Sequence, residues 1–289
     1  MKIFNFGSLN IDHVYAVEGF VQPGETIASL KYQRFCGGKG GNQSVALAYA
    51  GAHVCHVGRV GADGEWLKDR LAESGVDVFH IATGSEHTGH AIIQVDREGE
   101  NSIIVFGGAN RTLSEADVDL VLGAAEMGDY VLTQNETNCV DILLDKAWEQ
   151  ELFTIFNPAP ITASVRGYPL DKVNLFILNE TEGKSLTGKS APDEILAALL
   201  QRYPHSGVVL TLGSRGAQYR DNEMAISVPA EKVEVVDTTA AGDTFIGYFL
   251  AQLSQGSEIE YCLKLACKAA AICVQTRGAA DSIPKRSDV

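Results

Sequence analysis

A stretch near the carboxyl end, residues 235–253, places an acidic residue at the start of a helix. We expect a strand end at Val235 and Val236, a small-residue turn at 240–242, and then a helix with apolar residues at helical spacing. Because the side chains of this turn are so small, a ligand can approach its backbone closely. The unpaired N–H groups and the positive end of the helix dipole then form an anion site beside the carboxylate of Asp243. Acidic residues are also ordinary in a first helical turn, so spacing alone leaves both interpretations open.

A second group of polar residues lies near the amino end. Asn10 and Asp12 stand two residues apart, so on an extended segment they project from the same face. An amide and a carboxylate on one face can bind vicinal hydroxyls, although turn-forming residues give the same pattern. Four glycines at 37, 38, 40 and 41 are too many for a stable helix or strand, and an Ala-rich helix follows and ends near Gly51. Exposed backbone before a helix again indicates close approach of a ligand.

The segment DTTAAGDTFIG resembles the signature of the ribokinase (PfkB) family of carbohydrate kinases, roughly D-T-x-[GA]-A-G-D-x-F-x-G. Every fixed position is matched by Asp237, Thr238, Ala240, Ala241, Gly242, Asp243, Phe245 and Gly247. The resemblance implies that Asp243 is the catalytic base. It also implies that the backbone at Ala240, Ala241 and Gly242 holds the transferring phosphoryl group.

Two further segments resemble the sugar-binding motifs of that family, G-S-x-N-x-D and G-G-K-G-x-N-Q. Together with a glutamate after a later strand, the resemblance implies sugar contacts from Asn10, Asp12, Gly38, Lys39, Asn42, Glu136 and Asp243. The chain departs from the usual residues at Cys36 and Gly41. The set favours MgATP-dependent phosphorylation of ribose on its primary hydroxyl. Another substrate of the family, a deoxyribose, a ketohexose or a nucleoside, is the alternative.

The ATP and metal sites are implied in the same way. NETE at 179–182 resembles the family's N-x-x-E, which implies a phosphate contact from Asn179 and an indirect Mg²⁺ contact from Glu182. TLGSRG resembles the nucleotide loop and implies ATP contacts from Thr211, Gly213, Ser214 and Gly216, with Gly242. RGAADSIP resembles a terminal loop that helps to bind a monovalent cation, K⁺, which implies ligands at Asp237, Thr239, Gly278 and Ser282. Cys267 falls where some members have a histidine near the adenine.

The elements that must position these residues read as an α/β domain. From residue 129 onward, short apolar strands alternate with helices, which is typical of a parallel sheet buried on both faces. Ligands of such sheets bind at the carboxyl ends of strands, and polar residues gather there at Gln134, Glu136, Asn157 and 179–182. Two β-rich stretches, about 13–35 and 89–107, predict a small separate sheet. The family resemblance implies a ribokinase-like domain over 1–289, with a mostly parallel central sheet flanked by helices and these segments as a lid.

Composition excludes other classes of protein. The chain has 289 residues and a formal net charge of −14, so no surface is expected to neutralise nucleic-acid phosphates. The amino end does not read as a signal peptide, and no apolar run is long enough for a membrane span. The six cysteines form no C-x-x-C pair and read as reduced thiols of a cytoplasmic protein. Some family members dimerise through the lid, so a homodimer is a hypothesis.

Three other interpretations compete with a sugar kinase. Residues 183–190 fit the P-loop pattern literally, but NETE separates them from the preceding strand, where a P-loop must begin. A catalytically silent, sugar-responsive regulatory protein would have no use for an intact Asp243 and Glu182. A nicotinamide-dependent dehydrogenase would need the glycine fingerprint that GRVGADG lacks. His53 and His56 straddle a strand and are expected to pack in the protein rather than bind ligands.

Overall fold

The structure, a computed structural model, describes all residues from 1 to 289. The strands are β1 (Ile3–Phe6), β2 (Asn10–Ala16), β3 (Lys31–Gly37), β4 (Val54–Gly61), β5 (Ile81–Gly84), β6 (Gly89–Val95), β7 (Asn101–Phe106), β8 (Tyr130–Gln134), β9 (Phe153–Asn157), β10 (Leu175–Asn179), β11 (Gly207–Thr211), β12 (Ala217–Arg220) and β13 (Ala225–Val228). The α-helices are α1 (Lys39–Tyr49), α2 (Glu65–Glu73), α3 (Glu115–Leu122), α4 (Val140–Glu149), α5 (Glu180–Thr187), α6 (Pro192–Arg202), α7 (Ala241–Leu253) and α8 (Ile259–Cys273).

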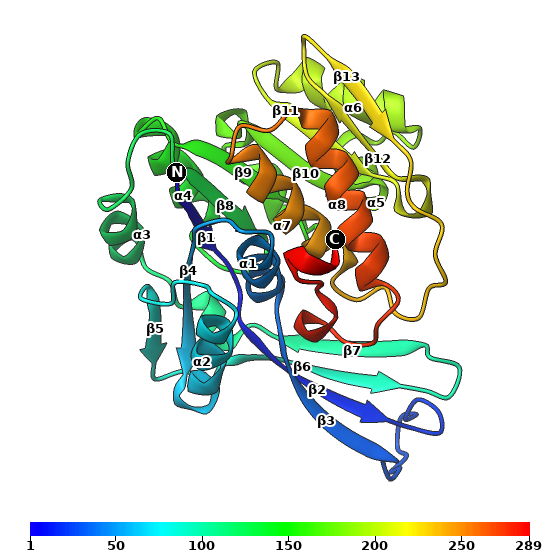
Figure 1. Ribbon diagram of the computed structural model, residues 1–289. Helices are drawn as coiled ribbons and strands as arrows, with labels where there is room; N and C mark the ends of the chain where they lie inside the picture. The colour runs from blue at the N-terminus through cyan, green and yellow to red at the C-terminus, as the bar shows by residue number, and fades with distance from the viewer.

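The main sheet has nine strands in the order β13-β12-β11-β10-β9-β8-β1-β4-β5. Neighbours from β11 to β5 are parallel. The β11–β12 and β12–β13 pairs at one edge are antiparallel, so β12 alone runs against the other strands. The central strands are apolar on both faces: Ile3 packs with α1, α7 and α8, while Phe4 and Phe6 pack with α3 and α4. Helices therefore cover both faces of the sheet (Figure 1). The mostly parallel α/β sheet expected from the strand pattern is confirmed.

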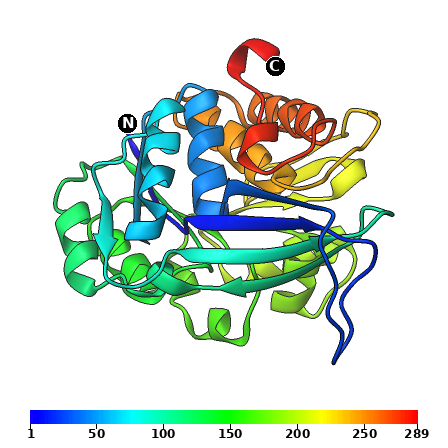
Figure 2. The same cartoon turned by 90° about the horizontal axis from the view of Figure 1, so that it is seen from below.

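A smaller sheet of four strands, in the order β3-β2-β6-β7, projects from the end of the main sheet (Figure 2). The β2–β3 and β6–β7 pairs are antiparallel, whereas β2 and β6 pair in parallel. A hairpin joins β6 to β7 at residues 96–100. The two β-rich stretches of the sequence thus form one sheet, although its first strand begins at Asn10 rather than at residue 13.

The expectation that the glycines near residue 40 form neither helix nor strand is wrong. Gly37 ends β3, and α1 begins at Lys39, so Gly40 and Gly41 lie within the helix. The reason is close packing, since a Cβ on Gly40 would lie 2.4 Å from the Cα of Gly7. Tertiary contact between α1 and the turn after β1 therefore outweighs the low helix propensity of glycine.

The expected strand end at Val235 and Val236 is also wrong. The last strand, β13, ends at Val228, and both valine side chains are exposed. The backbone N–H groups of Val236 and Asp237 donate to the carbonyl of Val274 at the end of α8. The segment is thus held by a helix terminus, and its β-branched residues have no neighbouring strand to pair with.

Two findings concern the whole chain. No helix is both long and apolar enough to cross a lipid bilayer. All six cysteines are free thiols, and all but Cys139 are buried.

Candidate active site

The carboxylate of Asp243 is buried in the first turn of α7. Ala240 precedes the helix with a left-handed backbone (φ 61°), which turns the chain sharply into it. Asp243 Oδ2 accepts a hydrogen bond from Asn42 Nδ2 at 3.0 Å, and Oδ1 accepts one from Gln43 Nε2 at 2.9 Å. Burial raises the pKa of Asp243 above its ordinary value, against the opposing effects of Lys39 and the two amides. The result is a proton acceptor held in one orientation.

Backbone donors lie beside this carboxylate. The N–H of Ala241 donates to the carbonyl of Thr238 at 3.3 Å, whereas those of Gly242 and Asp243 have no hydrogen-bond partner in the protein. Two unpaired amides at the positive end of a helix form a site for an anion. The expected anion site therefore rests on Gly242 and Asp243, and the amide of Ala241 is already engaged.

Gln43 is a site residue that the sequence reading missed. It is fully buried, and its Nε2 also reaches Asn157 Oδ1 at 3.2 Å. Its Oε1 accepts a hydrogen bond of 2.7 Å from Gln134, which in turn donates to Asn5. Because the hydrogen bond from Gln134 fixes the position of Gln43 Oε1, the Nε2 atom of Gln43 must face Asp243. The only sequence signal for Gln43 was its place after Asn42 in the motif, because its hydrogen-bond partners lie far away in the sequence.

A group of charged side chains surrounds Asp243. Glu136, from the loop after β8, accepts hydrogen bonds from the Lys39 backbone at 2.9 Å and from the Ser8 hydroxyl at 2.5 Å. Asp243 is the main cause of a raised pKa for Lys39, with smaller contributions from Glu136 and Glu182. The predicted residues Lys39, Asn42, Glu136, Glu182 and Asp243 are therefore brought within electrostatic range of one another.

The polar face of β2 meets this group from the lid side. Asn10 is buried, and its Oδ1 accepts a hydrogen bond of 2.8 Å from Asn110, a second residue that the sequence reading missed. Asp12 projects beside Asn10, and burial, with Glu136, raises its pKa to about 7. The carboxylate of Asp12 also leaves no room for a side chain at position 37, because a Cβ on Gly37 would lie 2.0 Å from Asp12 Oδ2.

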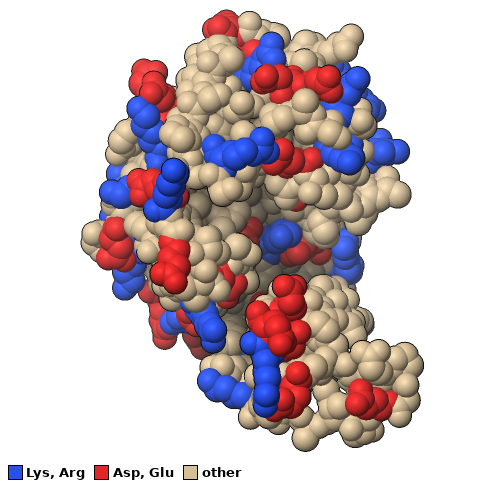
Figure 3. Space-filling model, turned by 90° about the vertical axis from the view of Figure 1, so that its right-hand side faces the viewer, with Lys and Arg blue, Asp and Glu red and all other residues tan.

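A cleft of about 570 Å³ opens beside these residues, with Asn10, Glu136 and Asn110 in its lining. In Figure 3 this side of the molecule is hollowed between the body and the projecting small sheet, and acidic and basic side chains meet there. The cleft presents amide and carboxylate side chains and lies at the carboxyl ends of the parallel strands, where ligands of such sheets bind. Hydroxyl groups of a sugar suit its amides and carboxylates.

The predicted nucleotide residues lie on neighbouring strand ends. Asn179 ends β10 and pairs in register with Thr211 at the end of β11. Gly213 and Ser214 follow in a single helical turn, and Gly216 closes it with φ 101°.

Asn179 and Glu182 cap α5 reciprocally. The Glu182 N–H donates to Asn179 Oδ1, and Glu182 accepts from the backbone and side chain of Asn179. Burial raises the pKa of Glu182.

The residues of the implied cation site also come together. Asp237 accepts hydrogen bonds from the N–H groups of Thr239 at 2.9 Å and Gly278 at 3.0 Å. Burial raises the pKa of Asp237, but these bonds outweigh it and hold the pKa below its ordinary value. The thiol of Cys273 lies 3.2 Å from the Ser282 hydroxyl and 3.7 Å from the Thr239 carbonyl. An ionised carboxylate, a carbonyl and a hydroxyl are oxygen ligands that suit a hard cation.

Two other sequence features lie outside the site. The first five residues of the P-loop match, 183–187, are helical and belong to α5, where Gly183 packs against Ile195. Cys267 lies in α8 on its buried face, and burial raises the pKa of its thiol to about 11. The P-loop match therefore does not form a loop whose backbone N–H groups could surround a phosphate.

Comparison with known proteins identifies the family of this chain. A family model described as pfkB family carbohydrate kinase matches residues 1–286. The ribokinase of Haemophilus influenzae is 37% identical, over 98% of this chain and 95% of its own length. The chain belongs to the pfkB family of carbohydrate kinases. The family and the ribokinase-like fold predicted from the sequence are thus confirmed, and the protein is a phosphotransferase that acts on a sugar hydroxyl.

Two solved structures of this kinase family match almost the whole chain. The ribokinase of Cryptococcus neoformans var. grubii serotype A in complex with ADP has a TM-score of 0.85 and 33% identity, and the match covers 99% of this chain and 97% of that one. The Arabidopsis thaliana ribokinase complexed with ribose and ATP has a TM-score of 0.85 and 31% identity, with 99% and 96% covered. The pfkB fold therefore extends over both sheets.

Proposed function

We propose that this kinase transfers the terminal phosphoryl group of ATP to the primary hydroxyl of D-ribose, giving ribose 5-phosphate and ADP. The observation that carries the proposal is the buried Asp243 carboxylate, held by Asn42 and Gln43 beside two unpaired N–H groups. The relatives named as ribokinases, and the ribose and ATP bound in one of them, support the choice of substrates.

The proposed mechanism follows from the charges of these groups. Asp243 accepts the proton of the attacking hydroxyl as the bond to phosphorus forms. The N–H groups of Gly242 and Asp243 then stabilise the negative charge on the phosphoryl oxygens. Lys39 holds the sugar next to Asp243, and its positive charge favours the ionised form of that carboxylate. Positioning and electrostatics supply most of the catalysis in phosphoryl transfer, which suits a site of pre-aligned donors.

The sugar is proposed to bind on Asn10, Asp12, Gly38, Lys39, Asn42 and Glu136, and ATP near Asn179, Thr211, Gly213, Ser214 and Gly216. The small sheet acts as a lid that excludes water and so limits hydrolysis of ATP. Glu182 would help to hold a Mg²⁺ ion indirectly, and that ion would supply charge neutralisation to the phosphates of ATP.

The test of this function is ATP consumption with a panel of D-ribose, 2-deoxyribose, fructose and a nucleoside, each with Mg²⁺. The proposal expects the highest kcat/KM for D-ribose. Preferred turnover of another sugar or of the nucleoside would support the kinase activity but contradict ribose as its substrate. No turnover of any acceptor, by a folded protein that binds ATP, would contradict the proposal and favour a regulatory role.

Potassium activation is a prediction from the residues around Asp237. We expect faster turnover in potassium chloride than in tetramethylammonium chloride at equal ionic strength, because the carboxylate of Asp237 and the oxygens of Thr239 and Ser282 suit a monovalent cation. Asp237→Asn should remove most of that difference, since it removes the charge. Equal rates of the unmodified enzyme in both salts would contradict the proposed cation site.

Sugar binding is predicted to depend on the ionisation of Asp12. Its pKa is raised to about 7 by burial and by Glu136, so the carboxyl is protonated below that pH and ionised above it. An ionised carboxylate accepts hydrogen bonds from hydroxyls more strongly, so kcat/KM for the sugar should rise between about pH 6 and about pH 8. Asp12→Asn should lower the plateau and abolish this step. A step that persists unchanged in the variant would assign it to another group.

A homodimer through the lid is proposed from the apolar side chains of β7. Ile103, Ile104, Val105 and Phe106 are between 49% and 65% exposed, which forms an apolar strip on an edge strand. A second copy of the chain can cover this strip. Sedimentation should give a dimer, and Ile104→Glu should give a monomer; a monomeric mass for the unmodified protein would contradict the proposal.

A further inference from the structure

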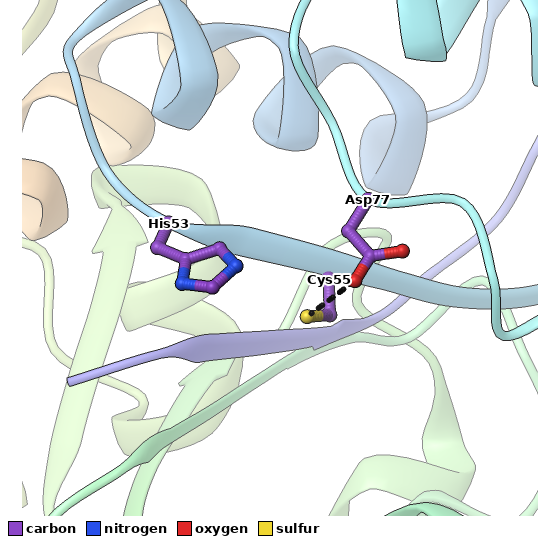
Figure 4. A group of neighbouring side chains, drawn as sticks. All are labelled: His53, Cys55 and Asp77. Carbon is purple, nitrogen blue, oxygen red and sulfur yellow. Dashed lines mark hydrogen bonds between the residues drawn. The ribbon is translucent and has the colours of Figure 1, made fainter.

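A cluster of three metal-ligating side chains lies away from the active site, at the opposite end of the parallel strands. His53 directly precedes β4, Cys55 is the second residue of that strand, and Asp77 follows α2. Their ligand atoms all lie within 4.8 Å of one another, and Figure 4 shows the imidazole, the thiol and the carboxylate gathered on one side of β4. His53 is exposed, so the expectation that both histidines of this strand pack in the protein is confirmed only for His56, which is fully buried.

Backbone pairing fixes the arrangement. His53 and Cys55 are two residues apart on an extended segment, so their side chains project from the same face. The backbone of Asp77 bonds to β4 on both sides of Cys55: its N–H donates to the Val54 carbonyl at 3.0 Å, and its carbonyl accepts from the His56 N–H at 2.9 Å. The Cys55 thiol donates to Asp77 Oδ2 at 3.5 Å. The cysteine and the aspartate are therefore held together by the sheet and not by chance contact of mobile side chains.

The chemistry of the three ligands selects the cation. An imidazole nitrogen, a thiolate and a carboxylate form a mixed set that suits zinc, whereas Mg²⁺ and K⁺ are bound by oxygen ligands alone. The burial of Cys55 shields one side of the set, and the exposed His53 and Asp77 leave a fourth position open to water.

We propose that His53, Cys55 and Asp77 form a binding site for one divalent cation of the zinc class, separate from the metals of the kinase reaction. The ion replaces the thiol proton of Cys55, which is released to water, and takes its place between the sulfur and Asp77 Oδ2. It links the start of β4 to the segment after α2, so it stabilises the edge of the main sheet. The imidazole of His53 turns inward as the third ligand.

The test uses Co²⁺ as an optical probe, added to the full-length protein after chelator treatment. We expect a near-ultraviolet thiolate-to-cobalt charge-transfer band that saturates at one ion per chain and is displaced by Zn²⁺ but not by excess Mg²⁺. Cys55→Ser should abolish the band, whereas Cys139→Ser, at a half-buried cysteine elsewhere, should leave it unchanged. His53→Ala should weaken Co²⁺ binding at least about tenfold, and it carries little risk of misfolding because the side chain is exposed.

Three results of these Co²⁺ experiments would overturn the proposed metal site. The absence of a charge-transfer band in the unmodified protein would overturn the site, as would a band that survives Cys55→Ser. Equal Co²⁺ affinity of the His53→Ala variant and the unmodified protein would also overturn it. The His53→Ala variant should keep the kinase activity of the unmodified protein in the absence of added zinc, since the cluster lies outside the active site.

Discussion

Asp243→Asn is expected to lower the turnover number by about 10²–10⁴-fold, the range over which general bases contribute. The substituted amide cannot accept the proton of the attacking hydroxyl. It also places an NH₂ group against one of the two amide donors, Asn42 or Gln43, that now bond to the carboxylate. The KM for ATP should change much less, because the residues proposed to bind the nucleotide lie elsewhere, at the ends of β10 and β11. Steady-state release of ADP with D-ribose measures both quantities.

The matched control for this substitution is Asp193→Asn. Asp193 also stands in the first turn of a helix, α6, but it is exposed and lies outside the site. Its variant should have the turnover of the unmodified enzyme. A thermal melt of the Asp243→Asn variant separates lost chemistry from lost structure. If the folded variant kept more than about a tenth of normal turnover, the role of Asp243 as base would be wrong.

Gln43→Met is expected to damage both catalysis and stability. Methionine is similar in length but has neither an N–H donor nor a carbonyl acceptor, so Asp243 Oδ1 loses a buried donor and the Gln134 amide loses a buried acceptor. An unpaired buried polar group costs about 1–3 kcal/mol. The Gln43 amide also lowers the pKa of Asp243 by bonding to its ionised form. Loss of that bond raises the pKa of Asp243, so the acidic limb of the kcat profile should move to higher pH.

Three measurements check this prediction: chemical denaturation, kcat at the optimum, and the pH dependence of kcat. We expect lower stability, a kcat reduced at least about tenfold, and a shifted acidic limb. A residue that only supports the fold would change stability and leave the limb in place. Gln150→Met makes the same change at an exposed position at the end of α4 and should alter none of the three. A variant with normal kcat and an unmoved limb would contradict a positioning role for Gln43.

Local patterns predicted the strand-end part of the candidate site, because several of its polar residues stand where a parallel strand ends. The strands β8 to β11 are short apolar runs, and their polar termini include Gln134, Asn157, Asn179 and Thr211. Parallel packing aligns these termini at one edge of the sheet, so residues far apart in sequence meet without further information.

The partners of these residues could not be predicted in the same way. The hydrogen bonds that join Gln43 to Gln134, and Gln134 to Asn5, span 91 and 129 positions, and no periodicity encodes them. The start of α1 depends on the contact of Gly40 with Gly7, and the conformation of Val236 depends on the end of α8. In each case a tertiary contact overrides the local propensity.

The most direct test of the proposed reaction is the position of the phosphate in the product. The enzyme would be incubated with MgATP and ribose labelled with ¹³C at C5, and the product followed by ¹³C and ³¹P nuclear magnetic resonance. The account predicts a coupling of the labelled carbon to phosphorus, with one ADP formed per sugar phosphate. Phosphate on any other carbon, or ADP released with inorganic phosphate alone, would contradict transfer to the primary hydroxyl of ribose.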